Sequence, residues 1–210
     1  MIPLEAIEQA RARIASAAVR IPLVRLVVDA PCEIYLKLEC LQPIGSFKIR
    51  GATNAIRSAD SAALARGVVT ASAGNMGQGV AWAARELGVP CTVVVPDGAA
   101  ETKVAAIERL GGKVVKVPYE EWWEAIATSS TPAAQGRFVH PVEDEAAHDR
   151  LPCLLPAEPG VSVRLPSRFS EDRRHCLLQG NLAVAVHPHE RLKRWGFDDG
   201  SRALPERRNA

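Results

Sequence analysis

The sequence predicts an α/β protein in which flanking helices and a parallel sheet form three layers. Between residues 67 and 141, short apolar runs of strand length alternate with amphipathic runs of helix length. A single helix between consecutive strands makes the right-handed crossover that a parallel sheet requires. The composition allows a sizeable core, because 47% of the 210 residues are hydrophobic.

The first fifty residues predict a helix, a strand and the start of a second helix. Residues 4–18 place leucine and isoleucine among charged side chains at helical spacing, and Pro3 is tolerated in a first turn. In residues 34–39 the aliphatic side chains at 34, 36 and 38 alternate with Tyr, Lys and Glu. This pattern is typical of a strand with one buried face. We expect the second helix to begin near Ser46, a good N-cap residue.

The alternating region follows with regular spacing. Gly88 is expected to end its first helix, and Pro96 to stop its second strand. In order, the predicted elements are a strand at 67–72, a helix at 75–88, a strand at 91–96, a helix at 101–112, a strand at 113–117, a helix at 119–129 and a short strand at 137–141.

The last third of the chain differs in character. Repeated prolines interrupt helices and central strands alike, so we predict an irregular tail over 144–210. Only residues 177–187 have the composition for a strand or two. The tail also contains His175, Cys176, His187 and His189, but they lack a zinc-site frame, and we expect no metal.

Composition argues against several classes of function. A formal net charge of +2 gives no general attraction to nucleic acid or to anionic membranes. No apolar stretch approaches the ~20 residues that span a bilayer, and the start of the chain lacks the pattern of a secretory signal. The five cysteines are scattered and form no CxxC pair, so we expect reduced thiols and a cytoplasmic protein.

The stretch "GSFKIRGA" at 45–52 places Lys48 beside an aromatic ring, where an extended segment turns into a helix. A lysine amine can condense with an aldehyde, and partial burial at a helix start favours such a role. Most lysines are instead solvated surface charges. Residue chemistry alone therefore favours the surface interpretation and leaves the chemical one open.

The stretch "SAGNMGQG" at 72–79 lies between a predicted buried strand and a helix. Its glycines let backbone N–H groups converge at the positive end of the helix dipole, which suits a carboxylate or phosphate. A plain strand-to-helix turn remains equally open. Nucleotide binding is a third interpretation, but the glycine spacing is not G-x-G-x-x-G, and the following strand at 91–96 holds no acidic residue before Asp97.

Taken together, "LKLECLQPIGSFKIRGA" at 36–52 and "SAGNMGQGVA" at 72–81 resemble the pyridoxal-phosphate enzymes of the tryptophan-synthase-β superfamily, fold type II. The likeness is greatest to threonine/serine dehydratases and serine racemases. It implies that 1–50 is the N-terminal part of a large cofactor-binding domain and that 51–143 is a small α/β domain. The tail at 144–210 lies outside the resemblance.

The resemblance also implies a role for each site residue. Lys48 would form the Schiff base with pyridoxal 5'-phosphate, and Phe47 would pack against the pyridine ring. Asn75 would hydrogen-bond the 3-oxygen of that ring. Ser72, with the backbone near Asn75 and Met76, would hold the α-carboxylate of the substrate. The open alternatives are a core aromatic for Phe47, a helix N-cap for Asn75 and a strand-end residue for Ser72.

The implied function is a lyase that converts threonine or serine to a 2-oxo acid and ammonia, with Lys48 as the base at the substrate Cα. Ala73 stands where serine racemases carry a second acid/base serine, so the resemblance disfavours racemisation. Met76 stands where histidine is usual, and no glycine-rich loop for the cofactor phosphate follows residue 143. The alternative is a truncated, non-catalytic family member that acts in binding or oligomerisation. A homo-oligomer is compatible with either.

Overall fold

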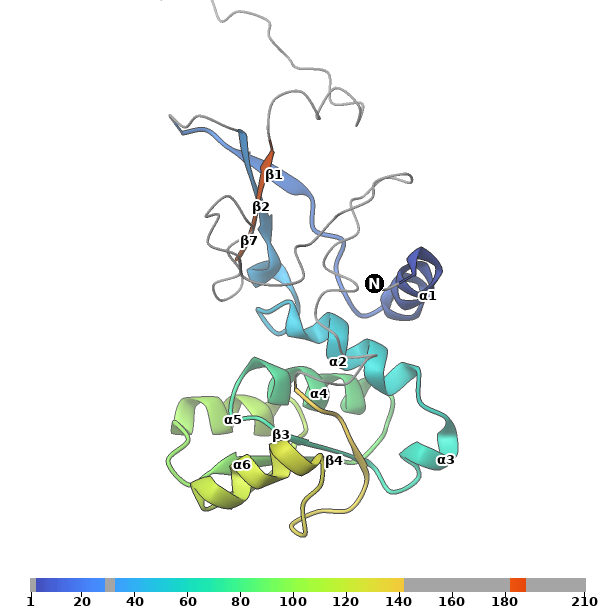
Figure 1. Ribbon diagram of the computed structural model, residues 1–210, viewed down its shortest axis with the longest axis vertical. Coiled ribbons are helices and arrows are strands. Elements are labelled where there is room, and N and C mark those ends of the chain that lie inside the picture. Colours follow the sequence, from blue (N-terminus) through green and yellow to red (C-terminus); the bar gives the residue numbers. More distant parts are fainter. Residues whose placement is uncertain (1–2, 29–32, 142–181, 188–210) are drawn as a thin grey trace, which may run out of the picture.

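The computed structural model describes residues 3–28, 33–141 and 182–187. They form two sheets (Figure 1): a four-stranded sheet with the order β5-β4-β3-β6 and a three-stranded sheet with the order β1-β2-β7. Among these residues, no helix has both the length and the hydropathy that a bilayer crossing requires.

The four-stranded sheet is parallel throughout, as predicted. Val68 of β3 pairs with Cys91 of β4 and with Arg137 of β6, and Val93 of β4 pairs with Val114 of β5. Its strands are β3 (Val68–Ala71), β4 (Cys91–Pro96), β5 (Lys113–Val117) and β6 (Arg137–Phe138). The intervening helices are α4 (Asn75–Glu86), α5 (Glu101–Arg109) and α6 (Tyr119–Thr128).

Helices cover both faces of this sheet, which confirms the three-layer prediction. On one face, the core joins Val93 of β4 to Val80 of α4 and Ile107 of α5. On the other face, Val94 of β4 packs with Ala125 of α6. Helix α2 (Lys48–Arg57) lies over α4 on the outer side of the first face (Figure 1). Alternate residues of β4 thus reach opposite layers, as the pleat of a strand requires.

Several helices end earlier than the sequence indicated. Helix α4 stops at Glu86, and Gly88 follows in the left-handed conformation with φ +67°. Helix α1 (Leu4–Ile14) stops four residues short of the predicted end at 18. The N–H groups of both Ala17 and Ala18 turn back to the Ile14 carbonyl there, which replaces a further helical turn. A short helix, α3 (Ser61–Leu64), connects α2 to β3 and was not predicted; the Asp60 side chain caps it.

The three-stranded sheet is antiparallel and contains β1 (Leu23–Leu26), β2 (Glu33–Leu38) and β7 (Leu182–His187). The sequence predicted β2, and β7 falls within the 177–187 stretch that was considered for a strand. Strand β1 was not predicted. The rest of the 144–210 tail lies outside the described residues, and the domain boundaries near 50 and 143 stay predictions.

Candidate functional site

A tight turn places Lys48 at the first position of α2. Gly45 adopts φ +67°, and its N–H donates to the Gln42 carbonyl at 2.7 Å. The Lys48 N–H then donates to Ser46 Oγ at 3.3 Å, while the N-cap residue Phe47 makes no capping bond with its side chain. Ser46 therefore supports the helix start as expected, although α2 begins two residues after it.

The Lys48 side chain is half-buried. Its Nζ lies 5.4 Å from the centroid of the Phe47 ring, within range of a cation–π interaction. Phe47 is itself half-buried and belongs to neither of the two core clusters of the parallel sheet. The Lys48 side chain thus lies beside an aromatic ring and is partly buried. Residue chemistry alone had favoured a fully solvated surface lysine.

The 72–79 loop begins where β3 ends, at the carboxyl edge of the parallel sheet. The Ser72 N–H continues the sheet ladder by donating to the Val94 carbonyl at 3.0 Å. Its Oγ accepts the Gly74 N–H at 3.3 Å. Gly74 is the N-cap of α4, and the first bond of that helix runs from the Gln78 N–H to the Gly74 carbonyl at 3.2 Å. The N–H groups of the first helical residues, 75–77, have no acceptor inside the helix. They lie at its N-terminus, which is the positive end of the helix dipole.

Asn75 and Met76 open α4 with different environments. Asn75 is exposed and is the first residue of the helix, so Gly74 rather than Asn75 occupies the N-cap position. The Met76 side chain is 3% exposed and belongs to the core between α4 and the sheet. The Met76 side chain is therefore not accessible to a ligand, and the backbone role expected for this residue stays a prediction.

Two glycines bring these segments together. A Cβ at Gly79 would lie 3.2 Å from the Lys48 carbonyl oxygen and 3.1 Å from the Ala52 Cβ. A Cβ at Gly77 would lie 2.3 Å from the Ser72 carbonyl oxygen. Glycine thus lets the start of α2 rest on α4 and lets α4 fold back onto the end of β3. The sequence indicated these glycines as a means of aligning N–H groups. Their close packing was missed, although two glycines two residues apart in one helix hint at it.

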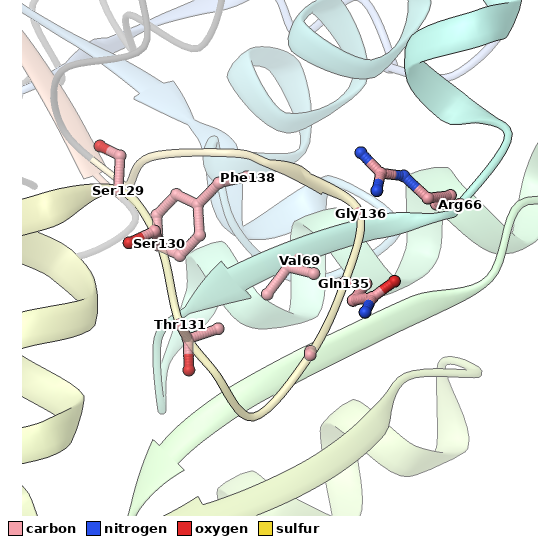
Figure 2. A pocket seen from close by; sticks show the side chains of 9 residues that line it. Arg66, Val69, Ser129, Ser130, Thr131, Gln135, Gly136 and Phe138 are labelled. Atoms are coloured by element: carbon pink, nitrogen blue, oxygen red, sulfur yellow. The ribbon is translucent and has the colours of Figure 1, made fainter.

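A separate cavity of about 210 Å³ contains none of the predicted site residues. It is lined by Arg66, Val69, Ser129, Ser130, Thr131, Ala134, Gln135, Gly136 and Phe138. In Figure 2 the hydroxyl groups of Ser129 and Ser130 point away from the apolar centre at Val69 and Phe138, and Arg66 lies on the far side. The polar groups do not converge, so this cavity does not add to the candidate site.

Metal-ligating side chains do not gather in the part of the chain that the structure describes: no group of three or more His, Cys, Asp or Glu residues lies there. Cys176 and His189, which were considered in the sequence, fall outside it, as does the side chain of His187. Burial raises the pKa of the Cys91 thiol to about 12, which keeps it protonated and unreactive near neutral pH.

Comparison with known proteins matches residues 15–148 to the family model described as "Pyridoxal-phosphate dependent enzyme". An L-threonine ammonia-lyase of Geobacter sulfurreducens is 40% identical over 170 residues, which cover 76% of this chain and 40% of that protein. A human serine racemase is 42% identical over 117 residues, which cover 54% of this chain and 34% of the racemase.

Solved structures agree. A serine racemase from Dictyostelium discoideum superimposes with a TM-score of 0.63 at 35% identity, covering 70% of this chain and 49% of that one. The chain therefore spans less than half the length of these relatives. The matched part contains Lys48, the 72–79 loop and the whole parallel sheet.

Proposed function

The chain belongs to the pyridoxal-phosphate dependent enzymes of fold type II, and from this premise we propose that it releases ammonia from threonine or serine. The products are a 2-oxo acid and ammonia: 2-oxobutanoate from threonine and pyruvate from serine. Threonine ammonia-lyases and serine racemases are about equally identical to this chain. The choice between the two activities therefore rests on the residues of this chain.

The residues present fit the cofactor. Lys48 is half-buried beside the Phe47 ring, and the Gly79 contact holds the lysine backbone against the helix that starts at the 72–79 loop. A planar aromatic cofactor with an aldehyde and a phosphate matches an amine, an aromatic face and a helix start. When bound, pyridoxal phosphate stabilises negative charge at the Cα of an amino acid.

The chain's own groups then have distinct tasks. Lys48 Nζ would hold the cofactor through its aldehyde and would be the base for the proton at the substrate Cα. The Asn75 amide and the Phe47 ring would hold the pyridine ring, with Asn75 as the hydrogen-bond partner of its 3-oxygen. The Ser72 hydroxyl and the N–H groups at the start of α4 bind the substrate carboxylate, since they lie at the positive end of that helix.

One observation carries this proposal: the backbone of Lys48 touches α4 at Gly79, one turn into the helix that begins with Asn75. Lyase chemistry is favoured over racemisation because a racemase needs a second acid/base group on the other side of Cα. Ala73, which directly follows Ser72 in the loop, has no group that exchanges protons.

The scattered cysteines support a cytoplasmic setting for the reaction.

The proposal is tested by adding pyridoxal phosphate to the purified chain, reducing with borohydride and locating the pyridoxyl group by peptide mass spectrometry. We expect one modified residue, Lys48, and no modification in Lys48→Ala. The matched control is Lys103→Ala, because Lys103 is an exposed lysine on α5 that should not affect the result. Modification spread over many lysines, with none preferred, would contradict the proposal.

Turnover is measured as 2-oxo acid and ammonia released from L-threonine and L-serine, with D-serine assayed in parallel. Formation of D-serine without a 2-oxo acid would assign the chain to racemisation instead.

A second candidate is a non-catalytic family member that acts by binding a partner. It is favoured by the exposed apolar side chains of β1, which offer a surface for a partner. Under this candidate Lys48 is not modified, and the chain gives no turnover alone. Turnover by the isolated chain would exclude it.

A further inference from the structure

The start of α2 is held by a buried charged network that the proposed roles do not use. Glu39 is 1% exposed and Arg50 is 6% exposed. Arg50 Nε donates to Glu39 Oε2 at 2.9 Å, and Arg50 Nη2 donates to Glu39 Oε1 at 3.0 Å. Two parallel hydrogen bonds of this kind fix the relative orientation of guanidinium and carboxylate, which a lysine could not do.

The network extends to a third segment of the chain. Arg50 Nη2 also donates to the Val19 carbonyl at 2.9 Å. Lys37 Nζ lies 3.6 Å from Glu39 Oε1 and donates to the Ile21 carbonyl at 3.2 Å. A single carboxylate thus compensates two cations, whose other donors bind the segment that leads from α1 into β1. The pair therefore joins the short 3-10 helix after β2 (η1, Glu39–Leu41), the first turn of α2 and residues 19–21.

This arrangement bears directly on Lys48. Residues two apart on a helix are separated by about 200° of rotation, so they project from nearly opposite sides. Drawing Arg50 toward Glu39 therefore turns Lys48 away from the network. The Lys48 carbonyl meanwhile meets Gly79 of α4, where even a methyl group would lie only 3.2 Å away. The first turn of α2 is consequently located by the charged pair and by the helix contact together.

Besides the charged pair and Gly79, apolar packing of Ile49, which is 0% exposed, contributes at this end of α2, whereas capping contributes little. Phe47 gives α2 no side-chain cap, and the bond from the Lys48 N–H to Ser46 Oγ is long at 3.3 Å. A buried ion pair adds little net stability compared with apolar residues of the same size, but removing one partner is strongly unfavourable. The consequence of such a pair is a defined geometry more than added stability.

We propose that Glu39 and Arg50 are positioning residues, which hold the first turn of α2 so that the Lys48 amine meets the cofactor. The inference rests on the proposed function, since it assigns Lys48 the covalent bond. Neither residue touches substrate or cofactor in this scheme. Their effect is transmitted through the helix backbone.

The first test is Arg50→Lys, which keeps the charge but loses the paired hydrogen bonds. Without cofactor, we expect the amides of residues 48–51 to exchange with deuterium at least tenfold faster, with exchange in α4 unchanged. With cofactor and borohydride, we expect Lys48 to be modified at least tenfold more slowly, because small misplacements of a reacting group reduce rates steeply. Glu101→Gln is the control, since its pair with Lys116 is exposed and joins α5 to β5 without involving α2.

A second variant covers the case in which Arg50→Lys does not fold. Glu39→Met combined with Arg50→Met replaces the pair with apolar side chains, an exchange that proteins often tolerate. We expect the parallel sheet to unfold at the wild-type denaturant concentration while Lys48 modification is again slowed at least tenfold.

The outcomes separate the two proposals. Absence of Lys48 modification in the wild type refutes the proposed function. Modification of the wild type, together with wild-type rates in the folded variants, refutes the positioning role alone. Faster amide exchange with an unchanged modification rate also refutes it, since the pair would then stabilise the turn without serving Lys48.

Discussion

Apolar strands of similar composition are buried in the parallel sheet and partly exposed in the antiparallel sheet. In β4, Val93, Val94 and Val95 are all 0% exposed, because helices cover both faces of the sheet. In β1, Leu23, Val24 and Leu26 are 38%, 44% and 37% exposed. Strand β1 is at the edge of its sheet, and no helix covers its residues in the described part of the chain. Burial is therefore set by the neighbouring layers, and strand composition alone does not determine it.

Candidate site residues lie where the two regions meet. Helix α2 follows the antiparallel sheet in the chain and packs on α4 of the parallel sheet (Figure 1). Lys48 is at the first position of α2, and the 72–79 loop belongs to the parallel sheet. The parallel-sheet region thus supplies the loop, and α2, which packs on that region, supplies the amine.

The largest expected difference is in thiol reactivity. Cys40 is exposed beside the antiparallel sheet, whereas Cys91 is buried in β4 with its pKa raised from 9.0 to about 12. The thiolate is the reacting form, so three pKa units lower the rate about a thousandfold, and burial lowers it further. Iodoacetamide at pH 8, followed by peptide mass spectrometry, should modify Cys40 at least a thousandfold faster. Comparable rates at the two cysteines would show that the parallel sheet opens readily.

The second largest expected difference is in the loss of stability when an apolar side chain is truncated. Ile107 is 0% exposed between α5 and the sheet, and Ile107→Ala is expected to lower the free energy of unfolding by about 2–5 kcal/mol. Leu26→Ala removes a partly exposed side chain from β1 and should lower it by less than about 1 kcal/mol. Urea unfolding followed by circular dichroism measures both. Equal losses would mean that Leu26 is covered in solution.

The sequence predicted the parallel sheet well because each strand there is short, apolar and followed by an amphipathic helix. The pattern in "CTVVVP" and "ETKVAAIER" reports burial on both faces directly. It failed for β1, since "LVRL" has four residues and no alternation, and its pairing with β2 is a contact between separate segments. Local pattern carries no information about which segment will pair with which.

The site was only partly predictable for the same reason. Lys48 and the 72–79 loop were found from local motifs, and the structure places the start of α2 against α4. Glu39 was missed because, in the alternating stretch 34–39, it occupies a polar position that would normally face solvent. Its burial depends on Arg50 and Lys37 reaching it, which requires the folded arrangement of β2 and α2.

Alkaline pH should weaken the parallel sheet through Cys91. The unfolded thiol loses its proton near pH 9.0, while the folded one keeps it until about pH 12. The folded state therefore binds more protons in this window, and the free energy of unfolding falls as pH rises through it. At pH 10.5 we expect a loss of about 2 kcal/mol relative to pH 8 from this group. Cys91→Ala should show a correspondingly smaller loss in urea titrations at the two pH values.

The smallest expected effect on folding is at Leu26, where a charge should matter for association and little for stability. Edge strands with exposed apolar residues pair readily with other chains, and charged residues on them prevent this. Leu26→Glu is therefore expected to change the free energy of unfolding by less than about 1 kcal/mol while it reduces self-association in light scattering. The matched control is Thr102→Glu, which adds the same single negative charge at an exposed position of α5 in the parallel-sheet region. If both variants reduce association equally, net charge is the cause. If only Leu26→Glu reduces it, the exposed edge of β1 is the surface through which copies of the chain associate. The antiparallel and parallel sheets would then differ in association as well as in burial.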